Sequence, residues 1–425
     1  MLIITEYGTL LLVLACIFGF FMAWGIGAND VANAMGTAVG SKALTLKQAL
    51  IIAAIFEFAG AFLAGGSVTN KISKGILESN IPILHDHPEL LVYGMISALL
   101  ATGSWLTLAT RLGWPVSTTH SIIGAIIGFA SVGISPKVVK WSALLSIVGS
   151  WVITPIIASC IAFIIFMSIQ KFILNTDSPY DNARRRIPFY IFFLGVVMSM
   201  VTTSEGLPAV GITLAYRHNL LIAIVVGFII AAFSRVILMR TKEQKFSGSH
   251  GHSPYSNVER LFGYMMVFTA CSMAFAHGSN DVANAVGPLA AVISIIKSKA
   301  IGTDTLLNQE VLILGGIGII VGLSTYGYKV IATIGENITE LTPSRGFAAE
   351  ISAAITVIIA SGIGLPISTT QTLVGAVLGV GMARGIAALN LNVIGTIFVS
   401  WVVTLPAGAI LSVIIFKILC YIFSY

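Results

Sequence analysis

Long apolar runs recur along this sequence, and they limit the folds that it can adopt more than any other feature. Charged residues make up only 9% of the chain, whereas soluble domains carry about 25%. Most of the runs are long enough to cross a hydrocarbon core of roughly 30 Å as a helix. We therefore expect an all-α polytopic membrane protein of about 10–12 transmembrane helices, with no soluble domain. The clearest runs are Leu10–Trp24, Ala49–Val68, Trp141–Phe166, Leu220–Leu238, Val311–Tyr328 and Val393–Phe416.

An internal duplication is the second strong constraint. The segment GANDVANAMG, which begins at Gly27, recurs as GSNDVANAVG from Gly278, with eight of ten positions identical. Further along, GWPVSTTHSIIGAIIG from Gly113 matches GLPISTTQTLVGAVLG from Gly364. Both pairs are separated by the same offset of 251 residues. Two matches at one offset indicate that the chain arose by duplication.

A third and weaker pair of segments extends this pattern. SWVITP begins at Ser150 and SWVVTLP begins at Ser400, an offset of 250 residues. Three matches in the same order predict that each half of the chain supplies one copy of a site. We therefore divide the chain into a first repeat (residues 1–170), linking helices (171–239), a polar loop (240–260) and a second repeat (261–425).

The basic loops predict how the chain is oriented in the membrane. Residues 240–260 and 171–186 carry most of the clustered Lys and Arg side chains, and the positive-inside rule places both segments in the cytoplasm. The N-terminal MLIITEYG has an acid and no basic side chain, which favours the outside. The two repeats would then enter the membrane from opposite sides. Such inverted repeats are typical of secondary transporters.

The first duplicated motif places a carboxylate and two carboxamides inside an apolar run. A charge at the bilayer centre costs at least ~2.5–3.5 kcal/mol, so matched charges favour a function. Helical spacing puts the three side chains on neighbouring parts of one face, and the flanking Gly25, Gly27 and Gly278 permit a helix break that would free backbone carbonyls. These oxygens suit a hard cation, and we expect that cation to be Na⁺. The alternative is that the polar side chains serve only to form hydrogen bonds between helices. The expected Na⁺ ligands are Asn29, Asp30, Asn33, Asn280, Asp281 and Asn284.

The second duplicated motif, Pro-x-Ser-Thr-Thr, predicts a helix start. Ser and Thr after Pro and before an apolar run are typical of an N-cap. A helix N-terminus offers unpaired N–H donors and partial positive charge, so two that face each other suit a small tetrahedral oxyanion. We expect re-entrant or broken helices here; the alternative is ordinary capping at depth. The expected anion ligands are Ser117, Thr118, Thr119, Ser368, Thr369 and Thr370.

Further polar residues break the symmetry of the repeat. His120 of the first copy is replaced by Gln371 in the second, and we expect Gln371 to be a further anion ligand. Glu57 and Glu350 lie within apolar runs and have no acidic counterpart in the other half. Ionisable residues inside a membrane are functional candidates by default. We therefore assign the two acids Glu57 and Glu350, together with His120, to coupling or gating.

Charge balance connects the two motifs. An oxyanion beside Asp30 and Asp281 needs cations, because a buried uncompensated charge costs several kcal/mol. Bound Na⁺ would neutralise the acids and improve the anion site. That positive linkage is the thermodynamic basis of symport.

Together these motifs resemble those of the inorganic phosphate transporter (PiT) family, along essentially the whole chain. The resemblance implies symport of inorganic phosphate with Na⁺ or protons, inverted repeats and homodimers. It also implies that the family's paired acids correspond to Asp30 and Asp281, and its anion-contacting serines to Ser117 and Ser368. The short central loop indicates a prokaryotic member, which would lie in the cytoplasmic membrane.

Other classes of function remain as alternatives. Sulfate permeases belong to the same family, and sulfate differs from phosphate in having no proton to donate to a carboxylate. An anion channel needs no coupling acids. The sequence contains no nucleophile–base arrangement and no cysteine or histidine spacing typical of a metal centre, so we expect neither an enzyme nor a bound cofactor. It has no basic face with interleaved aromatics, so we expect no nucleic-acid partner.

Overall fold

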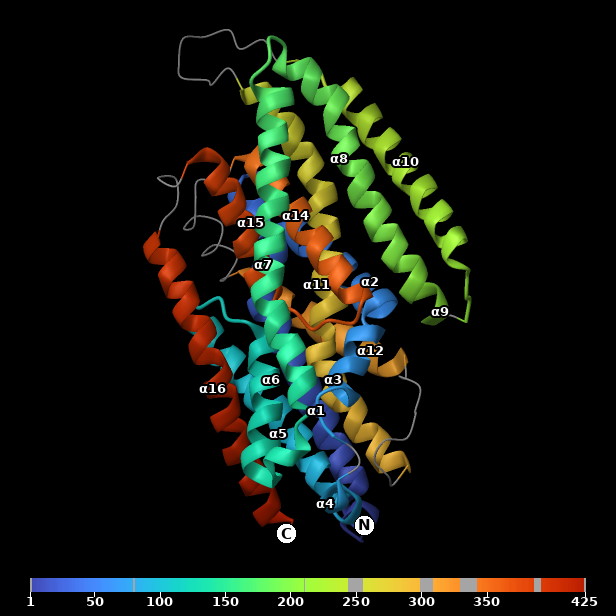
Figure 1. Ribbon diagram of the computed structural model, residues 1–425, viewed down its shortest axis with the longest axis vertical. Coiled ribbons are helices and arrows are strands. Elements are labelled where there is room, and N and C mark those ends of the chain that lie inside the picture. Colours follow the sequence, from blue (N-terminus) through green and yellow to red (C-terminus); the bar gives the residue numbers. More distant parts are fainter. Residues whose placement is uncertain are drawn as a thin grey trace.

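The computed structural model describes residues 2–78, 81–209, 211–243, 255–298, 309–328, 342–385 and 391–423, and these residues form a bundle of helices (Figure 1). Within them there is no strand, only an isolated bridge between Leu77 and Val139. The described part of the chain contains nine helices long and apolar enough to cross a membrane, and two shorter apolar ones, Thr118–Ile134 and Gln309–Thr325. This confirms the all-α polytopic architecture.

The helices follow one another closely along the chain. The part before the central loop contains α1 (Leu2–Gly40), α2 (Leu46–Ala64), α3 (Gly66–Lys74), α4 (Pro82–Asp86), α5 (Pro88–Arg111), α6 (Thr118–Gly128), α7 (Trp141–Ile169), α8 (Pro179–Val201), α9 (Leu207–Ala209) and α10 (Tyr216–Arg240). The part after it contains α11 (Ser256–Ser298), α12 (Gln309–Thr325), α14 (Pro343–Gly362), α15 (Thr369–Arg384) and α16 (Leu391–Ile422). Short helical segments join some of these: η1 (Phe129–Ile134), η2 (Pro136–Val138), η3 (Gln170–Leu174) and η4 (Thr202–Gly206).

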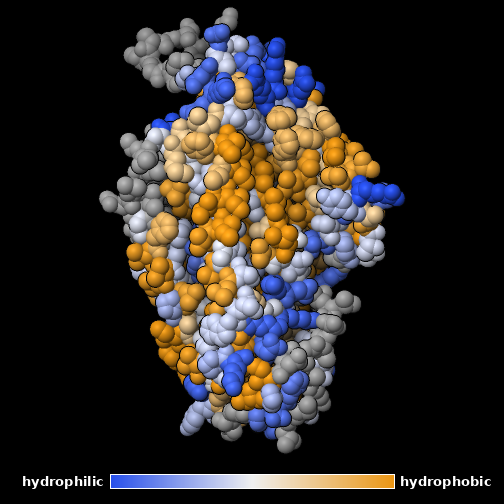
Figure 2. All heavy atoms as spheres, in the orientation of Figure 1, coloured by the Kyte–Doolittle hydropathy of each residue, from blue (hydrophilic) through white to orange (hydrophobic). Residues whose placement is uncertain are grey.

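The two ends of the bundle differ in what they carry. Both chain termini lie at one end, whereas α7 ends, α8 begins and α10 ends at the other (Figure 1). Figure 2 shows a hydrophilic cap at that second end, above a broad apolar surface. Helix α1 starts at the end that holds the termini, and α11 starts at the opposite end (Figure 1). Of the predicted polar loop at 240–260, residues 244–254 lie outside the described residues, and α11 already begins at Ser256.

Repeat-equivalent helices exchange packing partners between the halves. Helix α1 packs against α5 and α12, and its counterpart α11 packs against α14 and α2. In the same way α6 packs against α16, and α15 packs against α7. Each half therefore completes the core of the other, and the polar motifs meet where the halves cross.

The helix break that the glycines of the first motif would permit does not occur in either copy. Both α1 and α11 run as continuous α-helix through their Asn-Asp motifs. The glycines serve close approach instead. A Cβ on Gly27 would lie 2.0 Å from the carbonyl oxygen of Ile319, and one on Gly278 would lie 2.0 Å from that of Glu57. Small residues allow helices to pack this tightly in membranes, so these glycines bring α12 and α2 against the two polar faces.

The predicted break at the second motif is confirmed. Helix α5 ends at Arg111 and α6 starts at Thr118, with extended backbone just before α6. Helix α14 ends at Gly362 and α15 starts at Thr369 in the same manner. The turns use Gly113 (φ +68°) and Gly364 (φ +69°), a conformation that glycine adopts far more readily than other residues.

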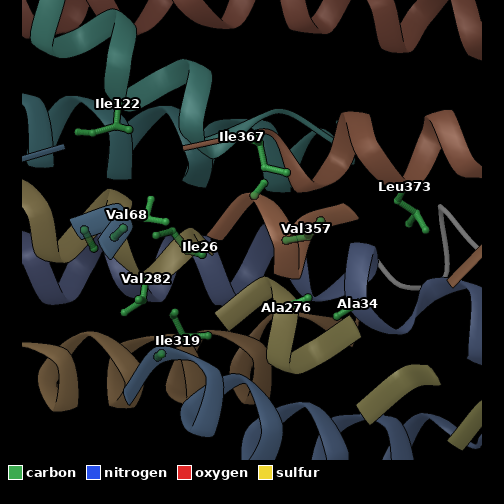
Figure 3. Close-up of a cluster of buried hydrophobic side chains, with 14 of the residues drawn as sticks. Ile26, Ala34, Val68, Ile122, Ala276, Val282, Ile319, Val357, Ile367 and Leu373 are labelled. Atoms are coloured by element: carbon green, nitrogen blue, oxygen red, sulfur yellow. The ribbon is translucent and has the colours of Figure 1, made fainter. Parts of the chain in front are cut away.

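Apolar side chains from both halves surround the motifs. Figure 3 shows Ile26 of α1, Val282 of α11 and Ile319 of α12 in one buried cluster. These side chains are not accessible to solvent. The polar site described below is therefore embedded in apolar surroundings, where unpaired charges and hydrogen-bonding groups are costly.

Candidate functional site

Asp30 and Asp281 lie close together in the centre of the bundle. Both carboxylates are buried, with 1% and 0% of the residue exposed. Each offers an oxygen that lies within 4.8 Å of the other and of a ring nitrogen of His277. The duplicated acids thus meet at one place, where α1 and α11 pack against each other.

The asparagines one turn later connect each acid to the other half of the chain. Asn33 Nδ2 donates to Asp30 Oδ1 at 2.9 Å and to Thr370 Oγ1 at 2.7 Å. Asn284 Nδ2 donates to Asp281 Oδ1 at 3.1 Å and to Thr119 Oγ1 at 3.1 Å. Each Asn-Asp motif is therefore hydrogen-bonded to the Pro-x-Ser-Thr-Thr motif of the opposite repeat.

The two Pro-x-Ser-Thr-Thr motifs are N-caps, as predicted. Ser117 Oγ accepts from the backbone N–H of His120 at 3.2 Å, and Ser368 Oγ accepts from that of Gln371 at 3.2 Å. Both serines are buried. The capping oxygen satisfies one N–H of the first turn, and the other first-turn N–H groups have no partner within the helix. These donors and the positive end of each helix dipole favour an anion.

The threonines beside the caps bind the two helix starts to each other and to the acids. Thr119 Oγ1 donates to the carbonyl oxygen of Ile367 at 2.8 Å, across the repeat boundary. Thr369 Oγ1 donates to Asp281 Oδ2 at 2.7 Å, and Thr118 Oγ1 accepts from Asn284 Nδ2 at 3.3 Å. The predicted anion-ligand threonines are therefore next to the predicted cation ligands, in a single site.

The first asparagine of each motif holds backbone rather than pointing at the acids. Asn29 Nδ2 donates to Thr110 Oγ1 at 2.9 Å and to the carbonyl oxygen of Trp114 at 3.2 Å. Asn280 Nδ2 makes the matching bonds to Ser361 Oγ and the Leu365 carbonyl, both at 3.1 Å. Asn280 Oδ1 also accepts from the backbone N–H of Ile367 at 3.3 Å, whereas Asn29 Oδ1 has no donor among the described residues. The role of both asparagines as Na⁺ ligands stays a prediction.

Several buried acceptor atoms in the site have no hydrogen-bond donor among the described residues. Such atoms are rare in folded proteins, and each needs an explanation such as an unplaced ion or water. Oxygens of this kind are the ligands that a hard cation such as Na⁺ requires. The unpaired oxygens are Asn29 Oδ1, Asp30 Oδ2, Asn284 Oδ1, Gln371 Oε1 and both carboxylate oxygens of Glu57.

His277 joins Glu57 to this site, and it is not among the residues predicted from the sequence. Its Nδ1 lies 3.2 Å from Glu57 Oε1 and its Nε2 lies 3.2 Å from Asp281 Oδ2, with all three side chains fully buried. These contacts are within ion-pair distance but outside hydrogen-bond geometry. The repeat position of His277 is Ile26. A buried polar residue with an apolar counterpart was the signal that could have identified it.

Glu350 lies apart from the paired aspartates. Thr37 on α1 and Thr269 on α11 both donate a hydroxyl hydrogen bond to its carboxylate. Thr37 is seven residues after Asp30 on α1, a distance of about 10 Å at 1.5 Å per residue. The structure therefore groups Glu57 with the aspartates and gives Glu350 separate hydroxyl partners.

The two positions at which the motifs differ face each other. The His120 ring lies against the Trp151 ring, with 3.9 Å between ring centroids and the two planes tilted by 34°. The side chain of Gln371 and the backbone of Trp401 also lie against it. His120 of α6 therefore contacts Trp151 of α7 and Trp401 of α16 beside the site.

A duplicated polar site that is buried in a bundle of apolar helices is typical of one class of protein, the membrane transporters. The chain belongs to the phosphate transporter family, whose model matches residues 26–412. The family and the chain's relatives are transporters or permeases rather than enzymes, as the sequence led us to expect.

Three similar proteins show how far this likeness extends. A Haemophilus influenzae protein named as a phosphate permease is 53% identical over 424 residues, which cover 99% of this chain and 100% of that protein. The inorganic phosphate transporter 2-1, chloroplastic, of Arabidopsis thaliana is 44% identical, with 99% of this chain and 73% of that protein covered. A solved structure of a protein named as the sodium-dependent phosphate transporter has a TM-score of 0.89 and 39% identity, and covers 97% of this chain and 99% of that one.

Proposed function

We propose that this protein takes up inorganic phosphate together with Na⁺ across the cytoplasmic membrane, by alternating access between its two repeats. Phosphate binds at the N-termini of α6 and α15, with hydroxyls of both Pro-x-Ser-Thr-Thr motifs and Gln371 as ligands. Na⁺ binds at oxygens of the two Asn-Asp motifs. Glu57, Glu350 and His120 take part in coupling or gating.

One observation carries this proposal. The hydrogen bonds Asn33–Thr370 and Asn284–Thr119 join the predicted cation ligands to the predicted anion ligands across the repeats. Anything that orders one motif therefore also orders the other. This supports reciprocal coupling between cation and anion binding, which a symporter requires.

Charge balance supports the same division of labour. The site contains the buried carboxylates of Asp30, Asp281 and Glu57, and His277 is the basic side chain in contact with them. A phosphate anion would add negative charge to this buried cluster, so bound cations are needed to offset it. The unpaired acceptor oxygens of Asn29, Asp30 and Asn284 suit Na⁺.

The relatives support the identity of both transported ions. The names of the two similar proteins from Haemophilus influenzae and Arabidopsis thaliana support phosphate as the anion. The similar solved structure is that of a sodium-dependent phosphate transporter by name, which supports Na⁺ as the coupled cation.

The arrangement of the helices supports inverted repeats. The equivalent helices α1 and α11 start at opposite ends of the bundle (Figure 1). The arginines at 184–186 and Arg240 lie on helices that meet at the end away from the termini, which supports a cytoplasmic location for that end and for the 240–260 loop. Cysteine labelling from either side of the membrane tests this: a cysteine in the 240–260 loop reacts only from the cytoplasmic side.

The function is tested by radiolabelled phosphate uptake into proteoliposomes. We expect an inward Na⁺ gradient to drive accumulation and a K⁺ gradient of equal size to leave it at the background level. Accumulation driven by a pH gradient without Na⁺ would replace Na⁺ by protons in the proposal. If sulfate competes better than phosphate, sulfate replaces phosphate as the proposed substrate.

The family resemblance also implies a homodimer. The mass of the purified protein in detergent measures this oligomeric state.

A further inference from the structure

The extended segments before α6 and α15 have backbone carbonyls that lack the partners a helix would supply. Buried backbone groups nearly always find partners. In the first segment, Asn29 donates to the carbonyl of Trp114 at 3.2 Å, and Thr370 donates to that of Val116 at 3.4 Å. In the second segment the equivalent donors follow the same pattern: Asn280 bonds the carbonyl of Leu365 at 3.1 Å and Thr119 bonds that of Ile367 at 2.8 Å.

The carbonyl between these two belongs to the motif proline, and its donor comes from the other half of the chain. Ser400 Oγ of α16 donates to the carbonyl oxygen of Pro115 at 3.2 Å. Trp151 Nε1 of α7 donates to the carbonyl oxygen of Pro366 at 3.2 Å. Three successive carbonyls of each segment are thus held by side chains, two of them from the opposite repeat.

Both donors belong to the third duplicated segment, which otherwise meets the site through the contacts of Trp151 and Trp401 with His120. That segment lies on α7 and α16, against which α15 and α6 pack. The packing is tight: a Cβ on Gly375 would lie 2.3 Å from the Pro155 carbonyl, and a Cβ on Gly124 would lie 2.3 Å from the Leu405 carbonyl. The helices that carry the predicted anion ligands therefore rest on the helices that carry these donors.

The two halves use different members of the segment. Trp151 is the donor on α7, and Ser400 is the donor on α16. Their counterparts, Ser150 and Trp401, do not bond a motif proline. Ser150 Oγ donates to the Ile147 carbonyl of its own helix at 2.6 Å. The Trp401 indole N–H finds no acceptor among the described residues.

We propose that Trp151 and Ser400 are positioning residues for the phosphate site. Each holds a proline carbonyl just before a capping serine, and so fixes where the N-terminus of α15 or α6 points. This rests on the proposed function, because it assumes that the two helix N-termini bind the anion. The repeat itself provides matched controls, since Trp401 and Ser150 have the same chemistry and no such bond.

The experiment compares four variants of the full chain in proteoliposomes: Trp151→Phe, Ser400→Ala, Trp401→Phe and Ser150→Ala. Loss of one buried hydrogen bond predicts a rise of about fivefold in the KM for phosphate in the first two variants. The two controls should keep the wild-type KM within about twofold, because they remove no bond to the site. Ser400→Thr retains a hydroxyl and should restore the wild-type KM.

A second readout does not depend on transport. Hydrogen–deuterium exchange of the backbone amides at 116–121 and 367–372 should increase in Trp151→Phe and Ser400→Ala and stay unchanged in the two controls. If all four variants behave alike in KM and in exchange, the positioning role is overturned. A different outcome is that the wild type takes up no phosphate while hydrogen–deuterium exchange still distinguishes Trp151→Phe and Ser400→Ala from the two controls. In that case the proposed function fails, but the hydrogen bonds to the proline carbonyls still position the two helix N-termini.

Discussion

Asn33 and Thr370, 337 residues apart in the chain, share a hydrogen bond of 2.7 Å between Nδ2 and Oγ1. The same Asn33 amide group also donates to Asp30 at 2.9 Å. This one side chain therefore connects the acid of the first repeat with the helix start of the second. The proposed function of the site depends on such bonds across the repeat boundary.

Removing the hydroxyl of Thr370 should weaken phosphate binding. Thr370→Val leaves the Asn33 amide with one partner fewer in a buried site, and we expect the KM for phosphate to rise about tenfold. Thr370→Ser should remain close to wild type. Thr372→Val is the matched control, because among the described residues its hydroxyl bonds only the Ser368 carbonyl of its own helix, at 2.8 Å. An equal effect in Thr372→Val would contradict the prediction.

Asp30 should govern the dependence of transport on Na⁺. Its Oδ2 is buried and has no donor among the described residues, so Asp30→Asn removes the charge that balances the cation. We expect the half-saturating Na⁺ concentration to rise at least about tenfold, which corresponds to ~1.4 kcal/mol of lost cation binding. Uptake as a function of Na⁺ concentration measures this.

A surface acid controls for the change of net charge in that experiment. Asp181→Asn removes a carboxylate that is 64% exposed and lies 3.9 Å from Arg184. It should leave the Na⁺ dependence unaltered. If Asp30→Asn also leaves it unaltered, the assignment of Asp30 to the cation is incorrect.

Gly278 should tolerate no larger residue, because the carbonyl of Glu57 occupies the space of its missing Cβ at 2.0 Å. Gly278→Ala should lower the free energy of unfolding of the detergent-purified protein by an amount typical of overpacking, about 1–3 kcal/mol or more. A fall in its melting temperature measures this. Gly263→Ala on the same helix is the control, since nothing lies within 4 Å of its added Cβ. A stable and active Gly278→Ala protein would show that α2 can shift without harm to the site.

Glu350 should affect the rate of transport more than phosphate binding. Its partners Thr37 and Thr269 lie away from the aspartates, so Glu350→Gln acts about 10 Å from Asp30 along α1. We expect the maximal uptake rate to fall about tenfold, with the KM for phosphate within about twofold of wild type. Thr269→Val should reproduce part of the decrease. A change confined to the KM would instead place Glu350 at the substrate.

Much of the site was predictable from sequence because the chemistry was duplicated. Asp30 and Asp281 were found as a matched pair in apolar runs, and the capping role of Ser117 and Ser368 is confirmed. Local rules suffice for these features, since a cap depends on residues within one turn. The repeat offset then predicted that both copies belong to one place.

Other features depended on neighbours that are remote in sequence. A glycine such as Gly27 can break a helix or admit another backbone, and only the position of Ile319 decides between these. Glu57 and His277 are far apart in the chain, and nothing in their local patterns indicates that they meet. Their contact follows from the packing of α2 against α11.

The sequence by itself determined the membrane class, the duplication and the residue types of the site, because hydrophobic length and repeated motifs are local properties. The tertiary structure decided which half each side chain serves. Helices α6 and α15 pack on α16 and α7 of the opposite repeats, so Trp151 and Ser400 hold the motif prolines of the other half. The physical reason is that tight helix packing and buried hydrogen bonds depend on distances in space, which the order of residues along the chain does not specify.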